Sequence, residues 1–442
     1  MPQRPDQAND RDPSAASTPA GDEATLTVRA ERMVAGGDAL ARLEDGRVAF
    51  VTGALPGEEV EIRLRNDRKD FVKSDAIEII EPAEERVVPT CPHRRAGCGG
   101  CGWMHFDVDA QLAAKAEIVE ESLRRIGRFE ADEVARLVEI GGGVEPFGYR
   151  TTIRLVGVAG GGVGFREERS DEVVAIDHCQ VAHENLSEVL RDVDVAPGVE
   201  LTLRTSEATG AVTARWTRPE DRRRRNERRR SNAAPGESVS GLPADVHIGD
   251  RAFLVEEVAG RKLQVSAPSF FQSGPDAAEL LVDAVERAAP ELSGAEHAVD
   301  AYGGVGLFAA TAMHDVRHVT LIESARSSCF DAEKNLAGRS GQGPKRLDVV
   351  RSEVGAWRPA EGAMPVDVLV ADPARPGLAK PGVATVVASN TPVLVLVSCD
   401  PVSLARDARL LADHGYRMER VEVFDLFPQT PHVECVTRFV KN

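Results

Sequence analysis

A cysteine and a glutamate near the end of the chain have the residue types of a nucleophile and its base. Cys399 directly follows an aliphatic run, 393–398, that reads as a short buried strand. Open α/β sheets place their chemistry at the carboxyl ends of such strands. Glu434 ends a later segment, 427–434, and a carboxylate there could face the same crevice as a proton acceptor. Because free cysteine is commonly a small buried apolar residue, Cys399 taken alone favours that structural interpretation, and the motifs below favour the nucleophile instead.

A glycine-rich turn provides a candidate cofactor site. The segment Asp300-Ala-Tyr302-Gly-Gly-Val-Gly306 follows a predicted strand, and its glycines would let the backbone approach a ligand closely. Glu323 ends the next predicted strand, where an acid commonly binds ribose hydroxyls. These features fit a nicotinamide cofactor as well as S-adenosylmethionine. Asp372 begins an Asp-Pro turn at the end of a further strand, and this turn, with Cys399 after the next strand, favours a methyltransferase.

Four cysteines have the spacing of a metal centre. Cys91, Cys98 and Cys101 are separated by six and then two residues, and Cys179 is a distant fourth thiol. Four thiolates can hold a zinc ion or an iron–sulfur cluster. Three clustered cysteines with one distant partner favour a [4Fe-4S] cluster, because structural zinc more often uses two close pairs. Three nearby histidines keep a mixed zinc site open as the alternative; they are His93, His105 and His178.

The elements that must position these residues fall into several domains, as expected for 442 residues. Short strands with glycine and proline turns predict a small β-barrel over residues 23–82, after a disordered polar tail, 1–22. A central region, 83–260, contains the cysteine cluster and a helical pattern over 107–128. From 261 to 442, strands and helices alternate, which predicts an α/β fold with a doubly wound, mostly parallel sheet.

Composition and charge restrict the partners. No segment approaches the roughly 20 apolar residues of a membrane span, so we expect a cytoplasmic protein that does not bind a membrane. The net charge of −17 argues against a polyanionic partner on average, but binding depends on local patches. One basic patch lies in the barrel, over 63–73. Another is an arginine cluster, 222–230, in an insertion over 218–236, which reads as a solvated, disordered loop that is compatible with RNA contact.

With these motifs in place, the chain resembles the bacterial RNA 5-methyluridine (uracil-C5) methyltransferases that carry a TRAM domain and a [4Fe-4S] cluster. The resemblance extends from about residue 23 to the C-terminus. It rests on segments in all three predicted domains: 50–58 in the barrel, 91–101 followed by Gln111 and Lys115, Phe271 with Gln272, and then 300–308, 372–377, 398–401 and 427–434. Four positions depart from the usual family pattern, and they are Gly274, Gly303, Leu307 and Asp400.

The resemblance implies a class I methyltransferase (Rossmann-like) domain, an OB-like barrel that binds RNA, and a monomer. It also implies a role for ten residues: Cys399 as nucleophile, Glu434 as general base, Gln272, Tyr302, Glu323 and Asp372 as contacts of S-adenosylmethionine, and Cys91, Cys98, Cys101 and Cys179 as cluster ligands. Whether the RNA is tRNA or rRNA stays open.

Two other functions are alternatives to methylation of uracil at carbon 5. An RNA cytosine-5 methyltransferase also uses a cysteine nucleophile, but that family's pattern has a second cysteine in the fourth-strand motif, and Asp372-Pro-Ala-Arg375 has none. An RNA-binding or chaperone protein with a vestigial methyltransferase fold is the other rival. The presence of both Cys399 and Glu434 speaks against it.

Overall fold

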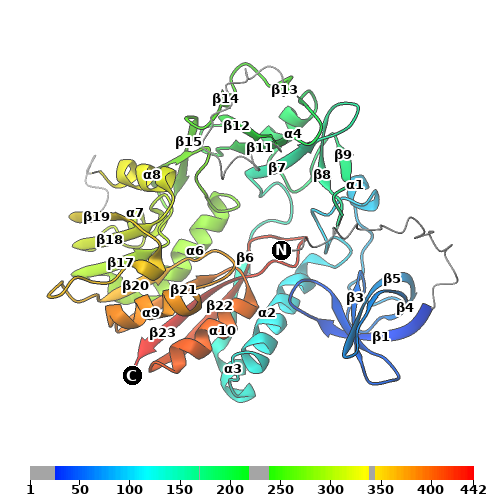
Figure 1. Cartoon of the computed structure of the whole chain (residues 1–442), viewed down its shortest axis with the longest axis horizontal. Helices are drawn as coiled ribbons and strands as arrows, with labels where there is room; N and C mark the ends of the chain where they lie inside the picture. The colour runs from blue at the N-terminus through cyan, green and yellow to red at the C-terminus, as the bar shows by residue number, and fades with distance from the viewer. Residues whose placement is uncertain (1–24, 169, 219–237, 338–343) are drawn as a thin grey trace, which may run out of the picture.

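The computed structural model describes residues 25–168, 170–218, 238–337 and 344–442. The predicted tail over 1–22 and the arginine cluster 222–230 lie outside them. Within the described residues the chain forms a small barrel, a large mixed sheet covered by helices, and a second sheet of six strands (Figure 1).

The N-terminal strands close into a barrel in the order β1-β2-β3-β5-β4. Their bounds are β1 Thr25–Met33, β2 Ala39–Arg42, β3 Val48–Thr52, β4 Glu59–Asp67 and β5 Phe71–Glu81. Alternate side chains point inward, and Val51, Val60 and Ile62 are completely buried. The predicted small OB-like barrel is confirmed.

The large sheet has eight strands in the order β19-β18-β17-β20-β21-β23-β22-β6. Their bounds are β6 Val138–Gly143, β17 His297–Ala301, β18 His318–Glu323, β19 Arg346–Arg351, β20 Val368–Ala371, β21 Val393–Ser398, β22 Tyr416–Asp425 and β23 Glu434–Lys441. β17 to β21 are parallel, and β23 is antiparallel to both of its neighbours. The predicted doubly wound α/β fold is confirmed.

Both faces of this sheet are covered, which is why its central strands are apolar on both sides. Val393, Val395 and Val397 of β21 pack against one layer of helices, whereas Leu394 and Leu396 pack against the other. The first layer contains α6 Pro275–Ala288, the short α7 Leu307–Ala310 and α8 Arg326–Leu336, with a 3-10 turn, η2, at Pro290–Leu292. The second contains α2 Val108–Arg125, α3 Ala131–Leu137, α9 Ala379–Ser389 and α10 Pro401–Ala412, with η3 at Val354–Ala356.

Helix α2 joins the barrel to the large sheet. Asp107 caps its N-terminus by accepting the Asp109 backbone N–H at 3.0 Å, which agrees with the helix predicted over 107–128. Its residues Ala114 and Ile118 pack with the barrel core, while Val119 belongs to the core under α10. The long helix is visible between these two parts of the molecule (Figure 1).

The remaining elements form the central part of the chain. The six-stranded sheet has the order β14-β12-β11-β7-β8-β9. Its strands are β7 Thr152–Gly157, β8 Val163–Arg166, β9 Val173–Ile176, β11 Glu200–Thr205, β12 Val212–Thr217 and β14 His247–Ile248. Nearby lie α1 Pro92–Arg95, α4 Glu184–Leu190, the pair β10 Asp194–Val195 and β13 Val239–Ser240, and the hairpin β15 Phe253–Val258 with β16 Arg261–Ser266. β6, from the stretch that we assigned to the central region, extends the large sheet.

Candidate active site and cysteine centre

Five of the predicted site residues lie at one edge of the large sheet. Tyr302 follows β17, Glu323 ends β18, Asp372 follows β20 and Cys399 follows β21. Glu434 is the first residue of β23, which runs in the opposite direction, so this end of β23 lies at the same edge. The edge is therefore the carboxyl end of the parallel strands, as the sequence predicts.

The nucleophile and base candidates are neighbours across β21 and β23. Ser398 pairs with Cys435 in this antiparallel ladder, so the next step of the register brings Cys399 opposite Glu434. Glu434 is buried and Cys399 is half-buried. Burial, with the negative charges of Glu434 and Asp372, raises the pKa of the Cys399 thiol to about 12. At rest, this cysteine is a thiol.

Asp372 and Glu434 form a pair of acids with raised pKa values. Burial raises the pKa of Asp372 to about 7, although a hydrogen bond from Gln272 opposes this. Gln272 Nε2 donates to Asp372 Oδ2 at 3.1 Å, which brings the loop before α6 into the crevice. Burial and the Asp372 charge raise the pKa of Glu434 well above its ordinary value. Two carboxylates so placed resist ionising together, so the crevice is suited to holding and releasing a proton.

The glycine turn has the properties of a ligand cradle. Gly304 has a φ of +54°, and a Cβ built there has no described atom within 4 Å, so the space beside it is open. Its N–H donates to Glu323 Oε2 at 3.1 Å. Tyr302 also has a left-handed φ, of +61°. These features leave the backbone accessible next to a carboxylate, which fits a ligand with a ribose.

Asp300 is a residue of this turn to which the sequence argument gave no role. It is buried, and Oδ2 accepts the Ala309 N–H at 3.1 Å, while Oδ1 has no partner among the described residues. Burial, with the charges of Asp372 and Glu323, raises the pKa of Asp300 to about 7. An unpartnered buried oxygen is costly unless a ligand or water satisfies it. In the sequence, Asp300 could have been identified as a candidate because it is the acid that begins the glycine-rich segment 300–306.

The four predicted cluster cysteines lie around one cavity of about 170 Å³. Cys91, Cys98 and Cys101 are buried and Cys179 is half-buried. Burial, with the neighbouring thiols Cys179, Cys98 and Cys91, raises the pKa of Cys101 to about 12, and the pKa values of Cys98 and Cys179 are raised by burial as well. Four thiolates in such a pocket would repel one another without a bound cation, so the donor set fits a metal centre.

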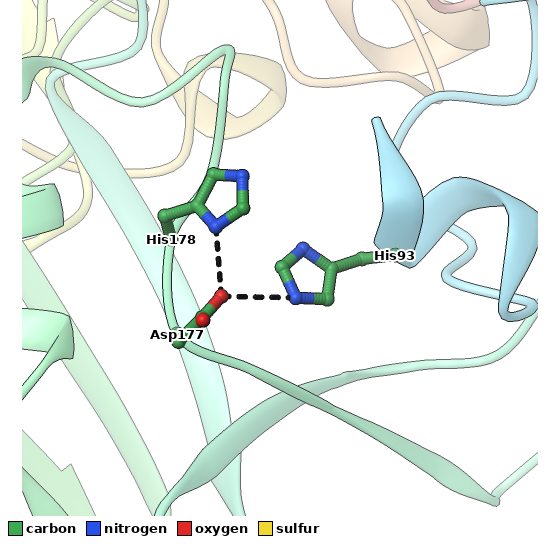
Figure 2. Close-up of side chains that lie close together, drawn as sticks. All are labelled: His93, Asp177 and His178. Atoms are coloured by element: carbon green, nitrogen blue, oxygen red, sulfur yellow. Dashed lines mark hydrogen bonds and ion pairs between the residues drawn. The ribbon is translucent and has the colours of Figure 1, made fainter. Parts of the chain in front are cut away.

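Two histidines and an aspartate lie at the side of this cavity. Asp177 Oδ1 is 3.1 Å from His93 Nε2 and 2.7 Å from His178 Nδ1, and Figure 2 shows both rings turned toward this carboxylate. The three donor atoms lie within 4.8 Å of one another, and both histidines also line the cysteine cavity. Imidazole and carboxylate are zinc ligands, so the mixed zinc alternative keeps two of its three histidines. His105 is absent from the lining residues.

The basic patch of the barrel lies on β4, β5 and their turn. Its five cationic side chains are exposed: Arg63, Arg65, Arg68, Lys69 and Lys73. Arg65 pairs with Asp75 at 2.8 Å, so part of the positive charge is compensated within the barrel.

Two family descriptions match parts of the chain. The TRAM domain matches residues 20–77, and the tRNA (Uracil-5-)-methyltransferase family matches residues 363–441. The first range includes most of the barrel, and the second includes β20 to β23 with both candidate catalytic residues. In the part of the chain that the structure describes, no helix has the length and apolar character needed to cross a membrane.

Relatives match almost the whole chain. An uncharacterized RNA methyltransferase of Streptomyces coelicolor is 35% identical over 419 residues, covering 91% of this chain and 89% of the relative. The 23S rRNA (uracil(1939)-C(5))-methyltransferase RlmD of Pseudomonas entomophila is 32% identical over 446 residues, covering 96% and 95%. The fold is also that of a Pyrococcus abyssi tRNA (uracil-54, C5)-methyltransferase solved with S-adenosyl-L-homocysteine, with 24% identity, a TM-score of 0.64, and coverage of 93% of this chain and 100% of that chain. The chain therefore belongs to the RNA (uracil-C5)-methyltransferase family and carries an N-terminal TRAM domain.

Proposed function

We propose that the protein transfers a methyl group from S-adenosylmethionine to carbon 5 of a uridine in structured RNA, through a covalent adduct on Cys399. The observation that carries this proposal is the placement of Cys399 opposite Glu434 at the carboxyl edge of the parallel strands. The relatives support the reaction class, because one is named for a uracil of 23S rRNA and another for a uracil of tRNA. The second was solved with the demethylated form of the methyl donor.

The role of Cys399 would be to activate carbon 5 of uracil for methyl transfer. Carbon 5 of uracil is too weak a nucleophile to attack a methyl sulfonium, and addition of a thiolate at carbon 6 activates it. The new bond joins Sγ to carbon 6, and the electron pair of the C5=C6 bond moves into an enolate spread over carbon 5 and the carbonyl oxygen on carbon 4. When bound, S-adenosylmethionine supplies the methyl group, which carbon 5 takes while the electron pair of the broken bond stays on the sulfonium sulfur.

Glu434 then completes the reaction as general base. Its carboxylate removes the proton on carbon 5, the C–H electron pair restores the C5=C6 bond, and the bond between carbon 6 and Sγ breaks to release Cys399 as thiolate. Because Glu434 must be ionised for this step, the original thiol proton has to leave to solvent, which the half-exposed Cys399 allows. A cation bound beside Asp372 would offset the negative charge that raises the Cys399 pKa.

Four residues are proposed to hold the methyl donor. Glu323 would bind the ribose, and Gln272, Tyr302 and Asp372 would line the crevice between the glycine turn and Cys399. Asp300 is added to this set, because its unpartnered Oδ1 can accept a hydrogen bond from the donor or from a water bound beside it.

The other parts of the chain would bind the cluster and the RNA. Cys91, Cys98, Cys101 and Cys179 would hold a [4Fe-4S] cluster, with zinc as the alternative metal. The basic face of the barrel would contact phosphates, and the target base must leave its stack to reach Cys399. The RNA would be tRNA or rRNA, bound by a cytoplasmic monomer.

Incubation of the protein with labelled S-adenosylmethionine and matched uridine- and cytidine-containing RNA tests the proposal. We expect label at carbon 5 of uridine and no label with Cys399→Ala. Methylation of cytidine would favour the cytosine-5 alternative. RNA binding with no methylation of either base would favour a vestigial enzyme.

A further inference from the structure

The segment that leads into Glu434 is a buried loop. This base loop, residues 426–433, connects β22 to β23 and delivers the proposed general base directly at its end. Pro428, Gln429 and Thr430 are buried, and Gln429 adopts a left-handed φ of +69°. A buried loop must have its backbone polar groups satisfied by other parts of the protein. Glu434 pairs with Phe424 of β22 on its strand side, and on its other side the groups that hold this loop help to fix its position.

Gln111 of α2 makes two hydrogen bonds with Gln429 of the base loop. It is completely buried, and its Oε1 accepts the Gln429 backbone N–H at 2.8 Å. Its Nε2 donates to the Gln429 side-chain oxygen at 3.3 Å and to the carbonyl of Phe106 at 2.9 Å. The backbone N–H of Trp103 adds a bond to the Gln429 carbonyl at 2.9 Å. The Gln111 side chain thus connects the base loop to α2, although Gln111 and Gln429 are 318 residues apart in sequence.

Lys115, one helical turn further along α2, holds the start of the base loop. It is completely buried, and its Nζ lies 2.5 Å from Asp425 Oδ1 and 3.3 Å from the Phe427 carbonyl oxygen. Asp425 also accepts the Phe427 N–H at 3.1 Å. Positions four apart on a helix share one face, so Gln111 and Lys115 act on the loop from the same side.

Two hydrogen bonds hold the base loop from other directions. The Tyr149 hydroxyl donates to the Pro428 carbonyl at 3.0 Å, and the Ser273 hydroxyl donates to the Leu426 carbonyl at 3.1 Å. Ser273 directly follows Gln272, whose amide bonds Asp372. The loop is therefore fixed between α2, the residues before β7 and the crevice itself.

We propose that Gln111, Lys115 and Tyr149 are positioning residues that hold Glu434 where it can take the proton from carbon 5. This inference rests on the proposed function, because it requires Glu434 to be the base. Burial of the polar side chains of Gln111 and Lys115 is costly unless both are bonded, and here both bond one loop. Glu434 is the residue at which the base loop enters β23, whereas Cys399 is not connected to this loop, so a loosened loop should impair proton removal more than addition or methyl transfer.

Gln111→Leu tests this with little change in packing volume. We expect kcat to fall on the order of 10- to 100-fold, as for a misplaced catalytic group, with KM for RNA within about twofold of its original value. The methylated RNA should accumulate on Cys399 as an adduct that survives denaturation. Tyr149→Phe removes a single hydroxyl and should give the same pattern at about two- to tenfold. Ser122→Ala is the matched control, because this buried serine of α2 bonds Ile118 of its own helix at 2.7 Å.

Hydrogen exchange of residues 426–433 in the full chain supplies a second measurement. Gln111→Leu and Tyr149→Phe should exchange faster in this loop, whereas Ser122→Ala should not. If Gln111→Leu does not fold, Tyr149→Phe alone decides the matter. Lower kcat without accumulated adduct, while Glu434→Gln does accumulate it, would overturn the positioning role and leave Glu434 as the base. Normal turnover of Glu434→Gln would instead overturn the base assignment and the positioning role with it.

Discussion

Replacement of Lys115 by Met tests whether the buried ion pair between Lys115 and Asp425 stabilises the base loop. The Lys115 side chain is 0% exposed and that of Asp425 is 6% exposed, so removal of the lysine leaves a buried, unpaired carboxylate. Breaking a buried ion pair in this way typically costs about 3–5 kcal/mol. Burial already lowers the pKa of Lys115 to about 8, so the lysine is still largely charged at pH 7. We therefore expect the free energy of local opening of the base loop to fall by about 3–5 kcal/mol at pH 7.

The stability lost in the Lys115→Met variant should depend on pH. Burial raises the pKa of Asp425, and Lys115 opposes that effect, so the pKa of Asp425 should rise further in the variant. The folded variant then binds a proton that the unfolded chain, with a pKa of about 3.9, does not bind. Its stability should fall as the pH rises from the unfolded to the folded pKa of Asp425 and stay constant above. The deficit relative to the original protein should therefore shrink as the pH is lowered.

The assay is native-state hydrogen exchange of residues 426–433, compared at two pH values, because it measures local opening without assuming two-state unfolding. Lys115→Met with Asp425→Asn is the matched control, since it leaves no buried charge unpaired and should recover most of the loss. A single-variant cost below about 1 kcal/mol, or a double variant that loses as much as the single, would refute the reasoning.

Three further predictions concern the other parts of the site. If the four cysteines hold the proposed [4Fe-4S] cluster, the original protein should be brown and Cys179→Ala should lose both cluster and colour, although Cys179 lies far from the other three cysteines in sequence; a colourless original protein with one zinc ion would contradict the cluster. Gly304→Val should raise KM for S-adenosylmethionine, because the side chain enters the open space beside the turn, whereas Gly362→Ala, at a φ of +73° in a loop before β20, should not. Alkylation of Cys399 should keep accelerating from pH 8 to pH 10, since its pKa is about 12; a plateau below pH 9 would contradict this electrostatic description.

The local patterns of the sequence identify the fold well. Buried β-branched runs such as 393–398 become strands, because such side chains pack on both faces of a covered sheet. The periodicity of 107–128 becomes α2, which begins one residue after its capping Asp107 and ends at Arg125. Because the carboxyl ends of parallel strands lie at one edge of a sheet, the sequence alone also predicts that Tyr302, Glu323, Asp372 and Cys399 lie close together.

The contacts that hold the base loop could not be predicted in the same way. The motif segments contain both Gln111 and Gln429, but their hydrogen bond spans 318 residues, and no local pattern encodes such a pairing. The addition of β6 to the large sheet is equally non-local, because Val138–Gly143 carries little apolar alternation and pairs with β22 far along the chain. The sequence suggests Glu434 as a proton acceptor near Cys399, but its burial is evident only from the structure.

The most direct test of the central claim is the fate of RNA on the Glu434→Gln protein. With labelled S-adenosylmethionine and substrate RNA, we predict a methylated RNA–protein adduct through Cys399 that resists denaturation and migrates slowly on a denaturing gel. Addition and methyl transfer remain possible in this variant, but the proton on carbon 5 has no acceptor. The Cys399→Ala protein should form neither adduct nor product. Normal turnover of Glu434→Gln, or inactivity without an adduct, would contradict the assignment and point first to Asp372 as the base.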